Sequence, residues 1–434
     1  MSALEQFVSQ VQILSANGHH LQLSYEVRKA VSDVLAKNVA HLENVLQTLD
    51  LQQHSLGVLG VLYARTVALN NANDFEAAFV QLQEFFSSCN GEQIRLLPDI
   101  YCELCHRISE ILINKQEPAR GISLLVKAIE RLQTSSSQLT LAHADLCMLC
   151  LKAKNFKPAL KFLDVDITDV AKEHCPVFDA KYFLSYYYYG GMIYAALKNF
   201  DRALHFFEVT VTTPAQAVSH IMIESYKKHI LVSLILHGKL THLPKYTSSV
   251  VARFIKPVCQ AYVELANAYA TNSPDALRDC VAKRTDVFNR DKNMGLVKQV
   301  VTSSIKRSIQ RLTKTFLTLS LFDVANRCRL SDPAEAEKYI VAMIEDGDIF
   351  ATINQKDGMV HFHDSPEKYD TPGVVRMIDT EVGSGIELSR LVRQLDLDIL
   401  LNPKYVQKVV KSSATTFHED EGVSVGASKE YSDL

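Results

Sequence analysis

Apolar residues recur at steps of three and four through roughly the first three hundred positions, and short polar breaks separate the runs. This spacing predicts amphipathic helices. Consecutive helices joined by two to six residues must pack antiparallel, as helical hairpins do. We expect such helices at about residues 75–86, 99–115, 120–133, 138–153, 157–164, 180–198 and 201–211.

A turn sequence recurs along this helical part. Lys154–Leu160 returns as Lys198–Leu204, forty-four residues later. Around the second copy lie the small and large residues of a tetratricopeptide (TPR) hairpin, in which small residues admit a neighbouring helix and large ones fill the gaps. These repeat-packing residues are Gly191, Tyr194, Ala203 and Phe207. We therefore predict a mainly α fold that begins with a right-handed solenoid of TPR-like helical hairpins over residues 1–215.

The pattern changes after a further helical part at 216–316. A short helix is expected to carry Leu319, Val324 and Ala325, and an acidic helix follows from Pro333 to Gly347. Two β-type runs then flank an Asp–Gly pair, which predicts a hairpin. These runs are Ile349–Ile353 and Met359–Phe362. Two helices and a hairpin predict a small winged-helix (α/β) subdomain at 317–365.

A last apolar pattern lies at residues 370–410. Its steps alternate between three and four when two gap positions are included, which is the spacing of a helical bundle. The alternative is a helix that folds back on the winged helix. Beyond it, residues 411–434 contain too little apolar surface to fold, which predicts a disordered acidic tail. The bundle candidates are Val374, Ile378, Leu388, Val392, Leu395 and Ile399.

The charge balance argues against a nucleic-acid or membrane partner. Lys and Arg number 46 against 49 Asp and Glu, so no general electrostatic field favours phosphates. The helix that would read DNA in a winged helix is acidic here, which disfavours a nucleic-acid-binding protein but leaves it as an alternative. A preceding helix is basic, and it predicts a solvated face or a docking site for an acidic partner. Its cations are Lys298, Lys306, Arg307, Arg311 and Lys314.

The nine cysteines favour reduced thiols, because no secretory signal precedes them. The forty-four-residue shift places Cys147 and Cys150 at the small and large packing positions of a repeat, so we interpret both as core thiols rather than zinc ligands. Cys102 and Cys105 share one helical face in the same way, but the sequence leaves open whether they bind a metal.

We find no catalytic constellation. The common zinc-protease, phosphate-loop, dinucleotide and nucleophile-elbow motifs do not occur. His361 and His363 lack a third ligand and share one face of the predicted hairpin. We therefore expect no catalytic residue, metal site or cofactor, and a zinc-binding enzyme stays only as an alternative class. No apolar run is long enough to span a membrane, so a soluble intracellular protein is expected.

The winged-helix residues resemble the PCI family, the scaffold subunits shared by the proteasome lid, translation initiation factor three and the COP-nine signalosome. The family's two helix motifs and its wing are matched by Leu321, Val324 and Ala325, by Glu337, Ile340, Met343, Ile344 and Gly347, and by residues 349–362. Further stretches resemble the signalosome branch along nearly the whole chain, such as Ala142–Cys147, Tyr186–Tyr194 and Asn293–Lys298.

This resemblance implies a PCI domain over residues 216–365 in a non-catalytic scaffold. The complex concerned removes the ubiquitin-like modifier Nedd8 from cullins and so regulates cullin-RING ubiquitin ligases, in cytoplasm and nucleus. A subunit of the proteasome lid or of initiation factor three is the alternative. In the family's metal-carrying subunit, a His-x-His pair is followed by Ser and Asp, where this chain has Thr371 and Val374.

The implied partners are other PCI subunits of a hetero-oligomer. The resemblance implies that winged helices join side by side through the wing and that C-terminal helices form a shared bundle. An exposed strand edge could accept another chain's strand. Alternatively, the apolar wing residues only close the hairpin on its own helices. The wing-edge candidates are Ile349, Phe350, Ala351, Ile353, Val360 and Phe362.

Overall fold

A computed structural model describes residues 3–68, 72–170, 179–364 and 371–410, so the predicted tail at 411–434 lies outside the described residues. The chain divides into two compact units, Met1–Phe362 and His363–Leu434. None of the helices among the described residues is both long and apolar enough to cross a membrane.

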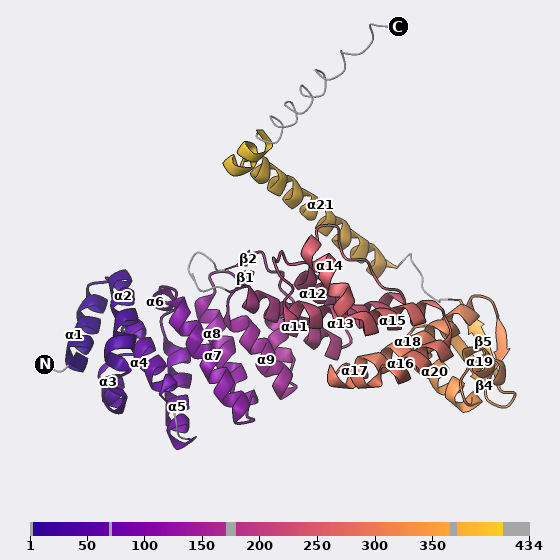
Figure 1. The fold of residues 1–434 in the computed structure, drawn as a ribbon, viewed down its shortest axis with the longest axis horizontal. Coiled ribbons are helices and arrows are strands. Elements are labelled where there is room, and N and C mark those ends of the chain that lie inside the picture. The colour runs from indigo at the N-terminus through magenta and orange to yellow at the C-terminus, as the bar shows by residue number, and fades with distance from the viewer. Residues whose placement is uncertain (1–2, 69–71, 171–178, 365–370, 411–434) are drawn as a thin grey trace, which may run out of the picture. The chain divides into compact units, whose positions relative to one another are not determined.

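The first unit begins with antiparallel helices that follow one another in space as they do in sequence (Figure 1). Helix α4 is buried along nearly its whole length, because Gly57 and Gly60 let helices α1 and α2 approach it closely. A short π-helical turn (Val31–Leu35) and a 3-10 turn (Val39–His41) follow α2. The helices are α1 (Ala3–Ala16), α2 (His20–Ala30), α3 (Leu42–Thr48), α4 (Ser55–Val67), α5 (Ala72–Ser88), α6 (Gly91–Ile94), α7 (Pro98–Asn114), α8 (Ala119–Leu132), α9 (Ala142–Ala153) and α10 (Lys157–Leu163).

The predicted hairpin repeat is confirmed by α9–α10 and by α11 (Ala180–Ala196) with α12 (Phe200–Thr212). Lys154 and Lys198, which occupy matching positions of the two copies, both have a left-handed backbone, with φ of 55° and 62°. The amide of the residue after each lysine donates to the carbonyl five residues earlier, at 3.1 and 2.9 Å. This arrangement ends a helix sharply and turns the chain into the next one.

One expected helix starts later than the sequence indicated. Residues 138–139 form a short parallel pair of strands with residues 169–170, so the helix begins only at Ala142. The strands are β1 (Gln138–Leu139) and β2 (Asp169–Val170). Two-residue strands carry too little alternation to be read from a sequence.

A second core follows, built on α13 and the helices that pack against it. Its buried charges are paired: the ammonium of Lys227 donates to Glu224 at 2.6 Å and to Asp291 at 2.7 Å, and Tyr262 also donates to Asp291. The helices are α13 (His220–His237), α14 (Ser249–Val258), α15 (Gln260–Ala270), α16 (Pro274–Lys283), α17 (Thr285–Arg290) and α18 (Met294–Thr313).

The predicted winged helix is confirmed, with one difference. Its sheet has the strand order β3-β5-β4, and β3 pairs antiparallel with β5 so that Leu319 lies opposite Val360. Leu319 is therefore in a strand, not in the helix expected there, because Ser320 accepts the amide of Asp323 and caps the helix after it. The elements are β3 (Thr318–Ser320), α19 (Leu321–Cys328), α20 (Pro333–Glu345), β4 (Phe350–Asn354) and β5 (Met359–His363).

The second unit contains the predicted C-terminal helix, α21 (Pro372–Leu401). The hydroxyl of Thr371 accepts the amide of Val374 and caps its first turn. The helix breaks at Asn402, before Pro403, and residues 403–410 are helical again.

Candidate functional site

The winged-helix sheet has two edge strands, β3 and β4, and β4 is the one that belongs to the hairpin. The sheet order places β5 in the centre and β4 at one edge. The outer side of β4 pairs with no other strand in the part of the chain that the structure describes. An edge of this kind can accept a strand from another chain. Phe350, Ala351 and Ile353 on β4 are partly exposed beside this edge.

For the side chains of the other wing candidates, the structure supports the alternative that they close the hairpin on its own helices. Val360 and Phe362 are on the central strand, and both side chains are buried in the third core, as is Ile349 just before β4. The sequence left both interpretations open because its pattern showed only the two strands of the hairpin. The third strand, β3, covers the far side of β5, so only β4 keeps a free edge of the hairpin.

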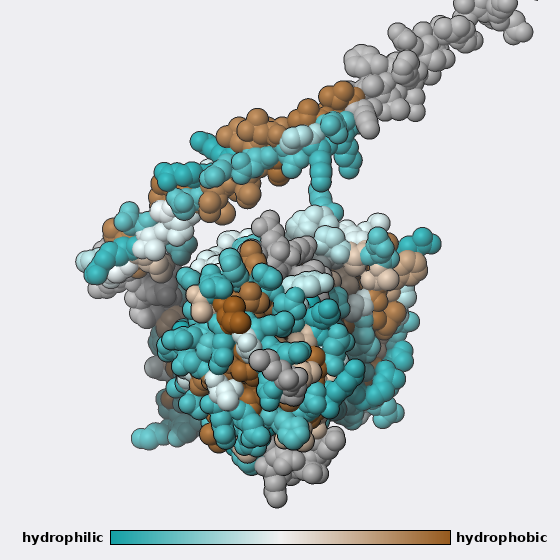
Figure 2. Space-filling view, turned by 90° about the vertical axis from the view of Figure 1, so that its left-hand side faces the viewer, coloured by the Kyte–Doolittle hydropathy of each residue, from teal (hydrophilic) through white to brown (hydrophobic). Residues whose placement is uncertain are grey.

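Helix α21 exposes a long apolar surface. None of the residues of this helix is buried. Of the predicted bundle residues, Val374 is half-buried and the rest are more than half exposed: Ile378, Leu388, Val392, Leu395 and Ile399. The two gap positions of the predicted apolar pattern are Glu381 and Gly385. The residues that follow them, Val382 and Ile386, are also exposed and widen the apolar surface of the helix. Figure 2 shows hydrophobic side chains along much of this helix. An apolar surface of this extent is typical of protein-interaction sites.

The basic face of α18 is largely used within the chain. Lys306 donates to Asp346 at 2.6 Å and to Asp348 at 3.1 Å, both just after the acidic helix α20. Arg307 donates to the last carbonyls of α13, and Arg311 to Asn272. Lys306 therefore binds acidic residues of the chain's own winged helix, which leaves this lysine less available to a separate acidic partner. Lys298 and Lys314 remain exposed.

The four repeat-packing residues meet between α11 and α12. A Cβ built on Gly191 would lie 2.7 Å from Cε1 of Phe207, so only glycine fits against that ring. Ala203 and Phe207 are fully buried, and the hydroxyl of Tyr194 donates to Asp164 at 2.7 Å. Gly190, which the sequence reading did not single out, approaches Phe206 equally closely. These contacts build the scaffold and leave nothing for a partner.

The thiols of the two cysteine pairs, Cys102/Cys105 and Cys147/Cys150, lie in surroundings that disfavour reactivity. All four thiols are buried, and burial raises the pKa of Cys150 to about 11 and the pKa of Cys105 and Cys147 well above the ordinary value. Since the thiolate is the nucleophile and the metal ligand, such thiols are poorly suited to either task. Across the described ranges, no group of three or more His, Cys, Asp or Glu side chains is placed to hold a metal ion.

Comparison with known proteins finds two matched regions in the chain. A family described as "COP9 signalosome complex subunit 3, N-terminal helical repeats" matches residues 17–251, and the PCI domain matches residues 270–364. The chain is 47% identical over 426 residues to "COP9 signalosome complex subunit 3" of Drosophila melanogaster, covering 95% of each protein. It is 36% identical over 410 residues to the protein of that name from Arabidopsis thaliana, covering 94% of each.

Proposed function

This chain belongs to the COP9 signalosome complex subunit 3 family, and we propose that it serves as a non-catalytic scaffold subunit of the signalosome. The observation that supports this most strongly is identity to relatives of that name along almost the full length of both proteins. The complex would remove Nedd8 from cullins, with the chemistry supplied by another subunit, and would work in cytoplasm and nucleus.

The proposed division of labour follows the fold. Residues 1–215 form helical repeats that reach a neighbour, residues 216–365 form the PCI domain, and residues 370–410 supply the helix for a bundle. The repeats offer stacked helices and no reactive thiol among Cys102, Cys105, Cys147 and Cys150, which suits a structural role.

The wing would join a neighbouring PCI subunit through β4. The outer side of β4 pairs with no other described strand, and Phe350 lies beside it with partly exposed apolar surface, as do Ala351 and Ile353, which also pack against the third core. Strand addition there would extend the three-stranded sheet across the subunit boundary. The side chains of Ile349, Val360 and Phe362 would not take part in this contact, because they are buried in the third core.

Helix α21 would enter a bundle with the C-terminal helices of other subunits. Its exposed apolar seam needs a partner that covers more than one face, because Val382 and Ile386 widen the predicted stripe. Helices with a seam of this spacing bury it against each other.

The test is purification of the tagged full-length chain from cells, with identification of the chains that accompany it. We expect other PCI subunits of the signalosome in equal amounts, together with removal of Nedd8 from a neddylated cullin by the purified assembly. Recovery of proteasome-lid or initiation-factor subunits in their place would contradict the proposal.

A further inference from the structure

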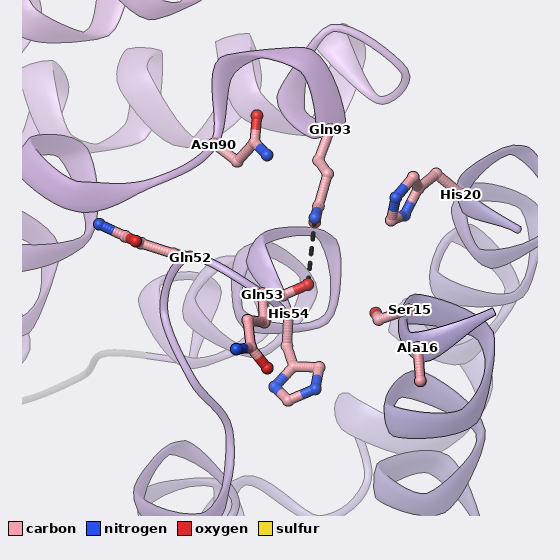
Figure 3. Close-up of a pocket in the computed structure, with 8 residues that line it drawn as sticks. All are labelled: Ser15, Ala16, His20, Gln52, Gln53, His54, Asn90 and Gln93. Carbon is pink, nitrogen blue, oxygen red and sulfur yellow. Dashed lines mark hydrogen bonds between the residues drawn. The ribbon is translucent and has the colours of Figure 1, made fainter. Parts of the chain in front are cut away.

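A polar pocket of about 410 Å³ lies between the first helical hairpin and the start of α4 and α6. Figure 3 shows its wall. One side comes from the end of α1 and the start of α2, and the other from the loop before α4 and from α6. Its lining contains amide, imidazole and hydroxyl side chains and no Asp, Glu, Lys or Arg. The lining residues are Ser15, Ala16, His20, Gln52, Gln53, His54, Asn90 and Gln93.

Three polar atoms of this lining have no hydrogen-bond partner although they are buried. They are Ser15 Oγ, His20 Nδ1 and Gln93 Oε1. The side chain of Gln93 is in a residue only 5% exposed, and Figure 3 shows it directed into the space opposite His20. Native structures rarely leave buried polar atoms unpaired, because each lost hydrogen bond with water destabilises the fold. Their clustering in one pocket calls for a common partner.

The orientation of the Gln93 amide is fixed by its neighbour. Its Nε2 donates to the carbonyl of Gln53 at 3.0 Å, so Oε1 must face away from that carbonyl. The pocket therefore presents a hydrogen-bond acceptor at a defined place. A matching ligand must bring an N–H or O–H group to it.

Donors are fixed on the other lining residues. His54 Nδ1 accepts the amide of Asp50 at 3.0 Å, so in the neutral ring Nε2 carries the proton and can donate. Asn90 Oδ1 accepts the amide of Glu92 at 2.9 Å, which leaves its NH₂ group as a donor. One fixed acceptor and donors on other residues of the same lining match a group that has both an N–H and a carbonyl oxygen.

We propose that this pocket binds a carboxamide group, presented by an Asn or Gln residue. The ligand NH₂ donates to Gln93 Oε1, and its carbonyl oxygen accepts from His54 or Asn90. A carboxylate of the same shape is rejected, because it has no N–H for Gln93 and finds no cation in the lining. The inference does not depend on the proposed function, since it uses only contacts within the first repeats.

The proposal requires a small displacement of the turn between α1 and α2, so that a ligand can reach the unpaired atoms. These atoms have almost no exposed area, so the wall must open slightly to admit a partner. Gly18, in that turn, has a φ of +71°, and a Cβ built on it would meet nothing within 4 Å. The turn that carries Ser15, Ala16 and His20 therefore has space beside it.

The experiment compares two isosteric probes on the full-length chain at pH 7.5: glutamine and glutamate, each with an acetylated amine and a methylamide at the carboxyl end. Binding is followed by ligand-observed NMR and titration calorimetry. We expect the glutamine probe to saturate with a dissociation constant of about 1 mM, which suits a ligand of this size. We expect the glutamate probe to bind at least tenfold more weakly.

Variants locate the site. Gln93→Leu and, separately, His54→Phe should each weaken the glutamine probe at least tenfold, whereas Gln83→Leu, at an exposed position on α5, should leave binding unchanged. Thermal unfolding by circular dichroism checks that each variant is folded. Two pocket variants are used so that, if one of them fails to fold, the other still tests the site.

Free glutamine, with its charged termini, is a third probe that separates two sources of the amide. Tighter binding of the blocked probe points to an Asn or Gln within a partner's chain, and tighter binding of the free amino acid to a metabolite. Lack of saturation by either form up to about 50 mM, equal binding of the glutamate probe, or full binding by both folded pocket variants overturns the proposal.

Discussion

Close packing of α11 on α12 depends on single residues, above all Gly191. The ring of Phe207 occupies the space that a Cβ would need, and Phe207 is itself fully buried, so it has little freedom to retreat. Gly295 in α18 is the contrasting case, because a Cβ there would meet nothing within 4 Å. Both glycines lie in helices, so comparing substitutions at Gly191 and Gly295 separates the effect of close packing from the effect of helix propensity.

We expect Gly191→Leu to lower the free energy of unfolding by about 1–3 kcal/mol, because the new side chain overpacks the repeat. Gly295→Leu should be neutral or stabilising by up to about 1 kcal/mol, since leucine is the better helix former. Urea unfolding of both full-length variants measures the difference. Equal effects would reject the close-approach argument.

Two buried histidines differ in their partners. Neither ring nitrogen of His229 has a hydrogen-bond partner, whereas His143 Nδ1 accepts the amide of Thr140 at 3.1 Å. Burial lowers the pKa of each to about 4. As the pH falls, the unfolded chain binds a proton at each histidine before the folded chain does. Above about pH 6.5 both states are neutral, so these histidines do not change the free energy of unfolding. Between about pH 6.5 and pH 4, each histidine lowers the free energy of unfolding by about 1.4 kcal/mol per pH unit.

We expect His229→Phe to reduce this acid-dependent loss by one histidine's share. At pH 7 it should be neutral or stabilising, because it removes two unpaired buried nitrogens. His143→Phe should instead destabilise at pH 7 by about 1–3 kcal/mol, since Thr140 loses its partner. Urea unfolding at pH 7 and pH 5 measures both. An unchanged pH dependence in His229→Phe would contradict the assignment.

Among the secondary-structure elements of the described residues, β4 lies at an edge of its sheet and α21 has an exposed apolar surface. The sequence predicted both elements, but their availability had different origins. The apolar spacing of α21 indicated an exposed or shared seam directly. The edge of β4 depends on the strand order β3-β5-β4, which the spacing of apolar residues does not contain.

We expect the double substitution Leu388→Asp and Leu395→Asp in α21 to abolish co-purification with the other bundle subunits, because two buried carboxylates would replace apolar contacts. The matched control is Ser389→Asp with Gln394→Asp, which adds the same charge one position away on each side. Quantified recovery of partner chains from cells gives the result. Equal losses in both double variants would argue against the seam.

The whole first unit contains three cores that are joined through shared helices. Val301 in α18 packs against both the second and the third core, and α18 contacts α13, α19 and α20. The winged helix is thus connected to the second core by α18, whose Lys306 binds Asp346, and by Arg278 of α16, which donates to the carbonyl of Arg329. A local disturbance of the third core should stay local, because the first core shares no residue with it.

We expect Met343→Ala, at a fully buried site of the third core, to reduce the stability of the winged helix by about 2–5 kcal/mol. Amide hydrogen exchange should speed up in α19, α20 and β5 and stay unchanged in α4 and α7. Leu62→Ala, in α4, should show the reverse. Faster exchange in α4 caused by Met343→Ala would show that the unit unfolds as a whole.

The sequence by itself determined the helical repeats, the winged helix and the terminal helix, because each depends on local periodicity and local turns. Lys154 and Lys198 show this: the repeated turn sequence marked two matching helix ends, and both lysines adopt the same left-handed backbone. Gly191 and Phe207 were predicted as packing residues of the repeat for the same reason, and the structure shows that they contact each other.

Only the tertiary structure decided which apolar residues face the core and which charges are already paired. The sequence left open whether Val360 and Phe362 lie at an edge or close the hairpin on its own helices, and a third strand from residues 318–320 places them in the centre of the sheet. Lys306 was expected to face a partner, but it binds Asp346, forty residues later. The unpaired oxygen of Gln93 is a third case. Each depends on groups brought together from distant parts of the chain, and neither apolar spacing nor a motif records such a contact.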